Sequence, residues 1–356
     1  DGAPAPVRWG ILGCADIARK FCHGAGVAPN ATIAAVASRS LDKAKAFAAE
    51  NAPGATAYDS YEALLADPAV EAVYIPLPTG MRKEWVLKAA RAKKHVDCEK
   101  PIATNFRDTE ECIQTCKEEG VQFMDNTMLM HNSRTSMMTK VIEDGELGPV
   151  KHIVSAFSIP FGNDPAWASS NIRMNAATEP LGALGDLGWY CIRASLWGFG
   201  WELPQDVCCH ILETTDDGVP ITMHCLLRYS GGRSAVFDCS FKAALRQWVE
   251  VVGEKKTLSF DDLVVNQSLD AHKFVIGEAS ITDRAITFPK ASEERTAPGC
   301  VQHANLIENM SAMIRKGELN PDWPERSSMT QRVLIACYAS GKAGGAAVKP
   351  SDVETQ

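Results

Sequence analysis

The stretch Val7-Arg8-Trp9-Gly10-Ile11-Leu12-Gly13-Cys14-Ala15-Asp16-Ile17-Ala18 decides the fold of the N-terminal third of the chain. Its first six residues are typical of a buried strand, and Asp16 to Gly26 is typical of a helix. The junction fits the pattern G-x-G-x-x-G/A if Ala15 replaces the second glycine. A turn without a ligand is the alternative. The position of this junction after the first strand of a βαβ unit favours a bound dinucleotide, whose pyrophosphate would face the N–H groups at the helix start.

Short apolar strands and helical stretches continue to alternate through the first third of the chain. We expect strands at 7–12, 32–38, 72–76, 95–98 and 121–124, and helices at 16–26, 41–50, 84–92 and 106–119. Such alternation requires crossover connections, which produce a doubly wound parallel sheet. The pattern predicts a Rossmann dinucleotide-binding domain over residues 1–130.

The pattern changes at about residue 149, where strand-like stretches follow one another without helices between them. They lie at 150–157, 206–213, 221–229, 234–241, 248–252 and 257–260, and helices follow at 302–316 and 327–339. Consecutive strands of this kind predict a mostly antiparallel, open-faced sheet. We therefore expect an α+β substrate and dimerisation domain over residues 131–356, whose last helix could pack back on the first domain.

Composition limits the classes to which the protein can belong. The chain has 356 residues, of which 46% are hydrophobic, and a net charge of −8. The length indicates about two domains, and the apolar content excludes global disorder. The acidic balance argues against nucleic acid or a membrane as the main partner, and no apolar run approaches the ~20 residues that span a bilayer. The start, Asp-Gly-Ala-Pro-Ala-Pro, shows no signal peptide, so we expect a cytoplasmic protein unless a transit peptide has been removed.

The twelve cysteines are spread thinly over a long chain, which is unlike a secreted disulfide scaffold. Cys112 and Cys116 lie four residues apart on a predicted helix face, where we expect them to pack as small hydrophobic residues. Cys208-Cys209-His210 lies in a predicted strand, whose neighbouring side chains point to opposite faces. This alternation argues against a metal site formed by the three. We expect free thiols in a reducing compartment and no metal.

Ser38-Arg39-Ser40 follows the second predicted strand, where NAD-selective sites usually carry Asp or Glu. A guanidinium and two hydroxyls suit a 2′-phosphate, and no carboxylate is placed to repel it. We therefore predict a preference for NADP(H) over NAD(H). The alternative is that Arg39 is a solvated residue and Ser40 the N-cap of the next helix, and Ser40 could serve both roles.

Glu99-Lys100-Pro101 follows the predicted strand at 95–98. Ligands of open α/β sheets bind at the carboxyl ends of the strands, so Lys100 would point into the crevice beside a nicotinamide. A surface charge is the ordinary role of a lysine at a strand end, but Pro101 stiffens the backbone, and a cis bond before it would aim the side chain. The predicted cofactor site comprises Gly13, Cys14, Ala15, Asp16, Ile17, Ser38, Arg39, Ser40, Pro76, Leu77, Glu99 and Lys100.

Four motifs together resemble the Gfo/Idh/MocA family of oxidoreductases. They are Gly-Ile-Leu-Gly-Cys-Ala-Asp-Ile-Ala at 10–18, Val-Tyr-Ile-Pro-Leu-Pro at 73–78, Cys-Glu-Lys-Pro at 98–101 and Gly-Ala-Leu-Gly-Asp-Leu-Gly-Trp-Tyr at 182–190. The branch that the chain resembles contains NADP-dependent D-xylose 1-dehydrogenase, trans-1,2-dihydrobenzene-1,2-diol dehydrogenase and uncharacterised plant relatives. The resemblance implies a Rossmann domain paired with an open sheet whose outer face forms a homodimer.

The resemblance also implies catalytic roles for Lys100, Asp186 and Tyr190. Asp186 and Tyr190 match the family's D-x-x-x-Y element, and residues four apart on a helix share a face. Tyr190 would be the general acid/base, and a nearby Lys100 ammonium would lower its pKa from about 10 by favouring the phenolate. Asp186 would orient the substrate or Lys100. A half-buried aromatic without a catalytic role is the alternative for Tyr190 taken alone.

The substrate site is the least defined part of the prediction. Its candidates are Met128, His131, Phe157, Phe161, Trp167, Arg173, Trp189 and Tyr190. His131 is at least as well explained as a structural histidine, and Arg82 as a surface charge instead of a phosphate ligand. Met130 and Ser133 depart from the family pattern. Trp197 and Trp201 are expected in the core or an interface. Val207, Ile221, Leu226 and Val236 are expected in the core first and in a dimer contact second.

The sequence as a whole predicts an NADP-dependent oxidoreductase. It would transfer hydride between the nicotinamide and a hydroxyl or carbonyl carbon of a sugar or cyclic diol. A redox-assisted glycoside-modifying enzyme with a recycled cofactor is one alternative. A catalytically silent NADP-binding regulator is the other, and the presence of both Lys100 and Tyr190 argues against it.

Overall fold

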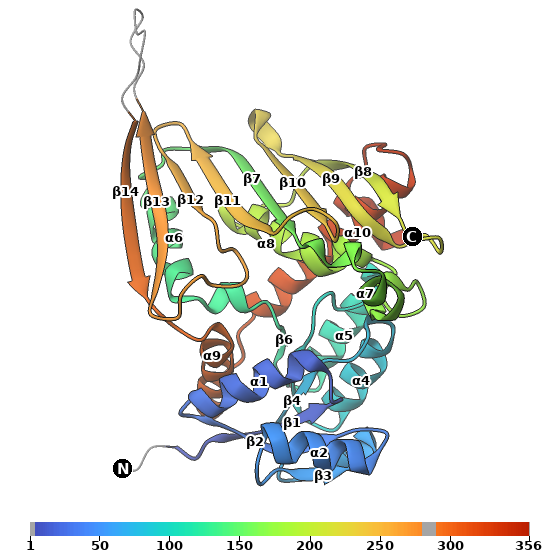
Figure 1. Cartoon of the computed structure of the whole chain (residues 1–356). Helices are drawn as coiled ribbons and strands as arrows, with labels where there is room; N and C mark the ends of the chain where they lie inside the picture. The colour runs from blue at the N-terminus through green and yellow to red at the C-terminus, as the bar shows by residue number, and fades with distance from the viewer. Residues whose placement is uncertain (1–3, 280–289, 356) are drawn as a thin grey trace, which may run out of the picture. The chain divides into compact units, whose positions relative to one another are not determined.

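The computed structural model describes residues 4–279 and 290–355, so the first three residues of the N-terminal stretch considered above lie outside it. The chain folds as two units (Figure 1). The first runs to His131 and also contains Val301–Gln331. The second contains Asn132–Cys300 and the residues from Arg332 onward. Each unit is described by itself.

The first unit is built on a six-stranded sheet in the order β3-β2-β1-β4-β5-β6, with every pair parallel. Its strands are β1 (Val7–Leu12), β2 (Ala31–Ala37), β3 (Thr56–Tyr58), β4 (Ala72–Ile75), β5 (His95–Cys98) and β6 (Phe123–Asp125). Its helices are α1 (Asp16–Val27), α2 (Leu41–Asn51), α3 (Tyr61–Ala66), α4 (Thr79–Arg91), α5 (Phe106–Glu118), the 3-10 turn η1 (Met128–His131) and α9 (Gln302–Lys316). The strand order reverses between β1 and β4, which is the switch point where such sheets bind ligands.

Contacts with β1 and α1 explain why helix α9, which comes late in the chain, belongs to the first unit. Trp9 of β1 is fully buried, and its indole Nε1 donates to Ser311 Oγ of α9 at 3.0 Å. Phe21 of α1 stacks on Tyr74 of β4 with ring centroids 4.1 Å apart. The helices α1 and α9 are in contact, with Gly24 so close to His303 that a Cβ there would lie 2.8 Å from the His303 Cβ. Helix α9, although it comes late in the chain, thus completes the core around β1.

Acid should weaken the first unit through His303. Burial, with the nearby positive charges of Lys20 and His23, lowers the pKa of His303 from 6.5 to about 4. The folded state therefore binds fewer protons than the unfolded state between these pH values, so stability is present above about pH 6.5 and is lost as the pH falls toward 4. The loss should reach roughly 2–3 kcal/mol at pH 4.5.

Urea unfolding at pH 7 and pH 4.5 measures this loss. The variant His303→Gln, which has no titrating ring, should show a pH dependence smaller by that amount. His224→Gln is the matched control, because His224 is an exposed residue of β9 in the second unit and does not contribute to the pKa shift of His303. An equal pH dependence in wild type and His303→Gln would exclude this role.

The second unit is built on an eight-stranded sheet in the order β14-β13-β12-β11-β7-β10-β9-β8. Among the described strands of this second sheet, only the β7–β10 pair is parallel. The strands are β7 (Val150–Ser158), β8 (Asp206–Thr214), β9 (Pro220–Arg228), β10 (Ser234–Ser240), β11 (Arg246–Gly253), β12 (Thr257–Phe260), β13 (Ala271–Ala279) and β14 (Lys290–Pro298). The predicted fold class, a Rossmann domain with a mostly antiparallel sheet domain, is confirmed.

The second unit also contains helices, some of which cover one face of this sheet, and short helical turns. They are α6 (Ser133–Glu143), α7 (Pro165–Ser170), α8 (Trp189–Gly198) and the short turns η2 (Pro160–Asn163), η3 (Ile172–Met174), η4 (Leu184–Gly188), η5 (Ser230–Gly232) and η6 (Pro350–Thr355). Helix α10 (Asp322–Lys342) crosses from the first unit to the second at Gln331. Helix α8 contacts β7, β10 and β11, and α6 contacts β13 and β14.

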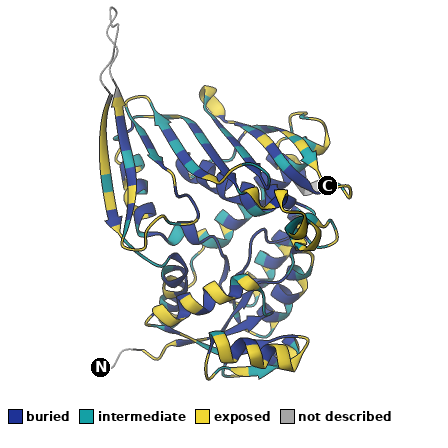
Figure 2. Ribbon diagram, in the orientation of Figure 1, coloured by how far each residue is buried: buried dark blue, intermediate teal, exposed yellow. Residues whose placement is uncertain are grey.

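Buried and partly exposed residues alternate along the strands of the large sheet (Figure 2), so its two faces differ in burial. Val207 and Ile221 are buried on the helix-covered face, as expected for core residues. Leu226 and Val236 lie on the opposite face and are partly exposed. The four residues that the sequence grouped together are therefore split between the two faces, because successive side chains of a strand alternate. Among the described helices, none is long and apolar enough to cross a membrane.

Candidate functional site

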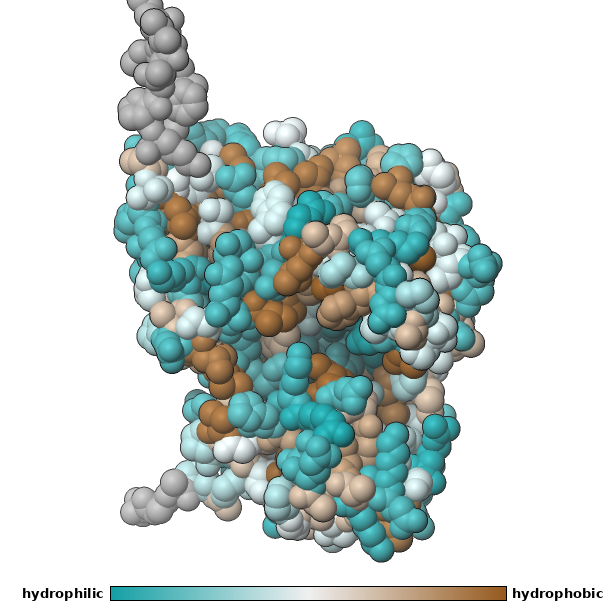
Figure 3. Space-filling model, in the orientation of Figure 1, coloured by the Kyte–Doolittle hydropathy of each residue, from teal (hydrophilic) through white to brown (hydrophobic). Residues whose placement is uncertain are grey.

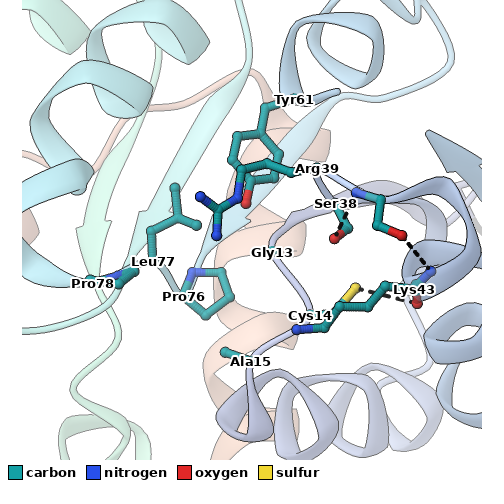
Figure 4. A pocket seen from close by; sticks show the side chains of 11 residues that line it. Gly13, Cys14, Ala15, Ser38, Arg39, Lys43, Tyr61, Pro76, Leu77 and Pro78 are labelled. Atoms are coloured by element: carbon teal, nitrogen blue, oxygen red, sulfur yellow. Dashed lines mark hydrogen bonds between the residues drawn. The ribbon is translucent and has the colours of Figure 1, made fainter. Parts of the chain in front are cut away.

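A hollow of about 530 Å³ lies in the first unit at the carboxyl ends of β1, β2 and β4 (Figure 4). Its lining comes from the turn after β1, the start of α2, the start of α3 and the segment after β4. The residues are Gly13, Cys14, Ala15, Ser38, Arg39, Ser40, Lys43, Tyr61, Pro76, Leu77 and Pro78. The sequence-predicted residues from Gly13 to Ala15, Ser38 to Ser40, Pro76 and Leu77 are thus brought together.

Gly13 makes the turn that opens the hollow. Its φ is +112°, in the region that side chains with a Cβ rarely adopt. A Cβ at this position would lie 2.9 Å from Leu77 Cδ2. The Gly13 N–H donates to Ala37 O at 2.9 Å, which ties the turn to the end of β2. The helix α1 then starts at Asp16, with its free N–H groups at the mouth of the turn.

Ser38, Arg39 and Ser40 form a polar edge of the hollow. Ser38 Oγ accepts from the Ser40 N–H at 3.4 Å, and Ser40 Oγ accepts from the Lys43 N–H at 3.3 Å as the N-cap of α2. Ser40 therefore is the cap that the sequence suggested, and it also lines the hollow. Figure 4 shows the exposed Arg39 extended between Tyr61 and Pro76. Burial raises the pKa of Tyr61, and the Arg39 charge opposes this shift.

Sequence reasoning missed Lys43, Tyr61 and Pro78. Lys43 lies in the first turn of α2, and Tyr61 is the first residue of α3. First-turn residues of the helices that follow the strands of a doubly wound sheet reach the same edge as the strand ends, and this rule would have found both. Lys43 adds a second cation to the lining, next to Cys14. Among the described residues that line the hollow, none is Asp or Glu.

Four predicted cofactor residues do not line this hollow: Asp16, Ile17, Glu99 and Lys100. The Asp16 side chain is fully exposed and pairs with Arg19, with 3.8 Å between Oδ1 and Nε. The Glu99 carboxylate accepts from Tyr74 OH at 2.6 Å and from the Lys100 N–H at 3.2 Å. Burial and this carboxylate raise the pKa of Tyr74. Glu99 thus fixes the backbone at Lys100 through the hydrogen bond that it accepts from the Lys100 N–H.

The Lys100 segment is fixed by buried contacts on both sides. The Lys100–Pro101 bond is cis, and the lysine is 8% exposed. Arg82, on α4, donates through Nε to Leu77 O at 2.7 Å and through NH1 to Pro101 O. It is 6% exposed, so it is not a surface charge. The surface-charge interpretation of Arg82 is therefore corrected. Arg82 ties the segment after β4 to the segment after β5, because the backbone carbonyls of Leu77 and Pro101 accept hydrogen bonds from it.

In the second unit, Asp186 and Tyr190 lie on consecutive turns. Asp186 belongs to the π-helical turn η4, and Tyr190 to the first turn of α8. Asp186 Oδ2 lies 2.8 Å from Arg173 Nε in an ion pair. The Tyr190 ring packs edge-on against Phe157 of β7, with centroids 5.8 Å apart. Rare π turns recur at functional sites, where they re-aim side chains.

Two glycines allow η4 to approach the sheet closely. Gly182 has a φ of +47°, and a Cβ there would lie 2.2 Å from Pro220 O of β9. A Cβ at Gly188 would lie 2.9 Å from Leu184 Cδ1 and 3.4 Å from Cys239 Sγ of β10. The backbone on both sides of Asp186 therefore lies close to the sheet, against the Pro220 carbonyl of β9 and the Cys239 side chain of β10.

Aromatic side chains precede this turn on exposed short helices. Trp167 of α7 lies between Phe161 and Phe241, with ring centroids 6.1 and 5.6 Å away. Phe161 is 53% exposed, and hydrophobic patches interrupt the hydrophilic surface of the second unit in Figure 3. Trp189 was expected beside them as a substrate residue. That expectation is wrong, since Trp189 is fully buried with the Arg193 guanidinium 5.4 Å from its ring centroid.

The segment around His131 has mainly structural contacts. His131 Nδ1 accepts from Asn309 Nδ2 at 3.0 Å, and its ring lies edge-on to Trp323 at 5.7 Å. These contacts agree with the alternative in which His131 is a structural histidine and not a substrate ligand. Met128 is buried in η1. Ser133 is the first residue of α6, and its Oγ donates to Pro298 O.

Comparison with known proteins agrees with this geometry. Residues 7–127 match the model of an oxidoreductase family with an NAD-binding Rossmann fold, and residues 135–259 match the GFO/IDH/MocA C-terminal domain. The chain is 36% identical to a D-xylose 1-dehydrogenase (NADP(+)) of Haloferax volcanii, over 96% of this chain and 99% of that protein. It is 30% identical to the trans-1,2-dihydrobenzene-1,2-diol dehydrogenase of Mus musculus, over 73% of this chain and 78% of the relative.

A solved structure shows the same fold. A 3-ketoreductase from Actinomadura kijaniata, in complex with NADP and TDP-benzene, matches with a TM-score of 0.82 and 27% identity, over 94% of this chain and 98% of that one. The predicted family and branch are confirmed by the two domain matches and by these relatives, of which the D-xylose 1-dehydrogenase spans nearly the whole chain. The chain belongs to the Gfo/Idh/MocA family of oxidoreductases.

Proposed function

We propose that the protein is an NADP-dependent dehydrogenase or reductase that acts on a hydroxyl or carbonyl carbon of a sugar or cyclic diol. The observation that carries this proposal is the hollow at the switch point of the first sheet. It combines a glycine turn at a helix start with two cations and two serine hydroxyls, and its lining lacks carboxylates among the described residues. Relatives named for NADP, for D-xylose and for a dihydrodiol support the same assignment.

The residues of the hollow fit NADP. The free N–H groups at the start of α1 suit the pyrophosphate. Arg39, Lys43 and the Ser40 hydroxyl suit the 2′-phosphate, which a carboxylate at this strand end would repel. Pro76 and Leu77 supply an apolar wall toward the nicotinamide half. A Cβ at residue 13 would fill the turn that the phosphates must approach.

Replacing Arg39 with alanine tests the cofactor assignment. The ratio of kcat/KM with NADP to kcat/KM with NAD should fall about 10- to 100-fold, because a charge-assisted phosphate contact is lost. Initial rates with each cofactor measure this ratio. Lys45→Ala is the matched control, since Lys45 is an exposed cation of α2 that does not line the hollow. An unchanged ratio in Arg39→Ala would refute the NADP assignment.

We assign the catalytic roles to Lys100, Asp186 and Tyr190. When bound, NADP supplies hydride transfer at its nicotinamide. Tyr190 would exchange the proton of the reacting hydroxyl, and the Lys100 ammonium would favour its phenolate. Asp186 would hold the substrate or Lys100, oriented by its ion pair with Arg173. Phe157 supports the Tyr190 ring through their edge-on contact.

The substrate class rests on the relatives and on the aromatic groups of the second unit. Phe161 and Trp167 offer faces that pack against the C–H groups of sugars or cyclic diols. Aldoses, keto sugars, dihydrodiols and dicarbonyls should be screened in both directions by NADPH absorbance. We expect turnover with a sugar or a cyclic diol. Tight NADP binding without any net absorbance change would refute the dehydrogenase assignment.

We also propose that the outer face of the large sheet forms a homodimer. Leu226, Val236 and Val154 are register partners across β9, β10 and β7, and all three are partly exposed. They form an apolar row on the face that the helices leave open. Val236→Arg should therefore convert a dimer to a monomer in sedimentation velocity, whereas Ala46→Arg on the exposed surface of α2 should not. A wild-type monomer would exclude the dimer.

A further inference from the structure

Three buried thiols meet in the second unit, outside the proposed active site. The Sγ atoms of Cys209, Cys225 and Cys337 all lie within 4.8 Å of one another. Cys209 of β8 and Cys225 of β9 are direct cross-strand partners, and Cys337 reaches them from α10. Their exposed fractions are 0%, 5% and 0%, so water does not compete for the sulfur atoms. The sequence could not predict this group, because its members are distant along the chain.

The contacts of α10 hold the three sulfur atoms in place. Ser340, one turn after Cys337, accepts from the Cys209 N–H at 2.8 Å and donates to Ala346 O at 2.6 Å. Gly341 lies so close to β8 that a Cβ there would be 2.8 Å from Ile211 Cγ1. The helix and the strand therefore approach through a hydroxyl and a glycine directly beside the cluster. A preorganised donor set of this kind loses little freedom when an ion binds.

We propose that Cys209, Cys225 and Cys337 form a binding site for Cu⁺. Thiolate sulfur is the donor that selects soft ions such as Cu⁺ and Zn²⁺. Metal–sulfur bonds of about 2.3 Å require sulfur atoms roughly 4 Å apart, so the three need to close by less than about 1 Å. Zn²⁺ in structural sites is almost always four-coordinate, and a water as fourth ligand would be buried at a cost here. Cu⁺ accepts three sulfur ligands, which matches the number present.

Binding of Cu⁺ at this site is a ligand exchange without electron transfer. The ion displaces thiol protons, which leave to solvent, and three Cu–S bonds replace the bonds of copper to its carrier. Copper remains Cu⁺ and the sulfur atoms remain unoxidised. The inference is independent of the proposed enzymatic function, so its test measures metal binding instead of turnover.

The test is an anaerobic titration of the reduced full-length protein with Cu⁺ from a coloured Cu⁺ chelator. We expect the wild type to withdraw one Cu⁺ per chain, both when Cu⁺ is added to the folded protein and when it is present during refolding. Cys337→Val and Cys225→Val, which keep the packing volume, should abolish this transfer. Cys112→Val is the matched control, since Cys112 is an equally buried thiol in α5 of the first unit.

The ion and its ligands are checked separately. X-ray absorption at the copper edge should show three sulfur neighbours at about 2.3 Å. A parallel titration with Zn²⁺ should show weaker binding, and tighter binding of Zn²⁺ would overturn the choice of Cu⁺. Circular dichroism confirms that each variant is folded. Because Cys337→Val and Cys225→Val remove different ligands, the test remains possible if one of them fails to fold. Failure of the wild type to withdraw Cu⁺, or equal transfer to Cys337→Val, would refute the site.

Discussion

Replacing Tyr190 with phenylalanine lowers kcat about 10²- to 10⁴-fold, because the hydroxyl that would carry the substrate proton is lost. The affinity for NADP should stay unchanged, since Tyr190 lies in the second unit and the cofactor hollow in the first. The ring itself is preserved, so its edge-on contact with Phe157 is kept. Steady-state kinetics with the substrate found in the screen, together with fluorescence titration of NADPH, measure both quantities.

Tyr229→Phe is the control for loss of a buried tyrosine hydroxyl. Tyr229 is also buried in the second unit, packs against Phe199, and its hydroxyl has no hydrogen-bond partner among the described residues. This variant should retain full turnover. A Tyr190→Phe enzyme as active as Tyr229→Phe would remove Tyr190 from the mechanism, while leaving the family assignment intact.

Replacing Arg134 with methionine lowers the free energy of unfolding by about 3–5 kcal/mol, because a buried carboxylate loses its partner. Arg134, 2% exposed, pairs through NH1 with the Asp262 carboxylate and donates to Lys273 O at 2.7 Å. Its guanidinium also lies 4.5 Å from the centroid of the Phe260 ring. One side chain thus joins α6 to β12 and β13. Urea unfolding followed by circular dichroism measures the loss.

An exposed ion pair provides the control for this prediction. Arg228 and Asp206 pair on the surface of β9 and β8, with 2.6 Å between Nε and Oδ1, and Arg228→Met should change stability little because water screens the pair. The double variant Arg134→Met, Asp262→Leu should recover part of the loss, since it removes the stranded charge. If Arg134→Met costs no more than Arg228→Met, the buried pair is not a major support of the second unit.

Local patterns predicted much of the fold and most of the residues that line the hollow. Residues 7–18 contain the strand, the turn and the helix start in one uninterrupted segment, and Gly13 is where the structure requires a positive φ. Ser38 to Ser40 follow directly from the end of β2. In these places, sequence neighbours are also spatial neighbours, so the residue types alone carry the information.

Long-range contacts were not predictable in the same way. The contact of Trp9 with Ser311 joins residues that are 302 positions apart, and no local signal links α9 to β1. Arg82 looked like a surface cation on an exposed helix, but backbone carbonyls of two other segments accept from it. The strand alternation at Cys208-Cys209-His210 is real, with Cys209 alone of the two cysteines buried. Its thiol partners come instead from β9 and α10.

The close approach of η4 to β9 and β10 has a consequence for how substrate preference can change. Asp186 lies between Gly182 and Gly188, which pack closely against the sheet, whereas Phe161 and Trp167 project from short surface helices. Exchange of the aromatic residues therefore leaves the acidic group where it is. Directed evolution toward new substrates should accumulate changes in residues 160–174 and tolerate almost none at the two glycines.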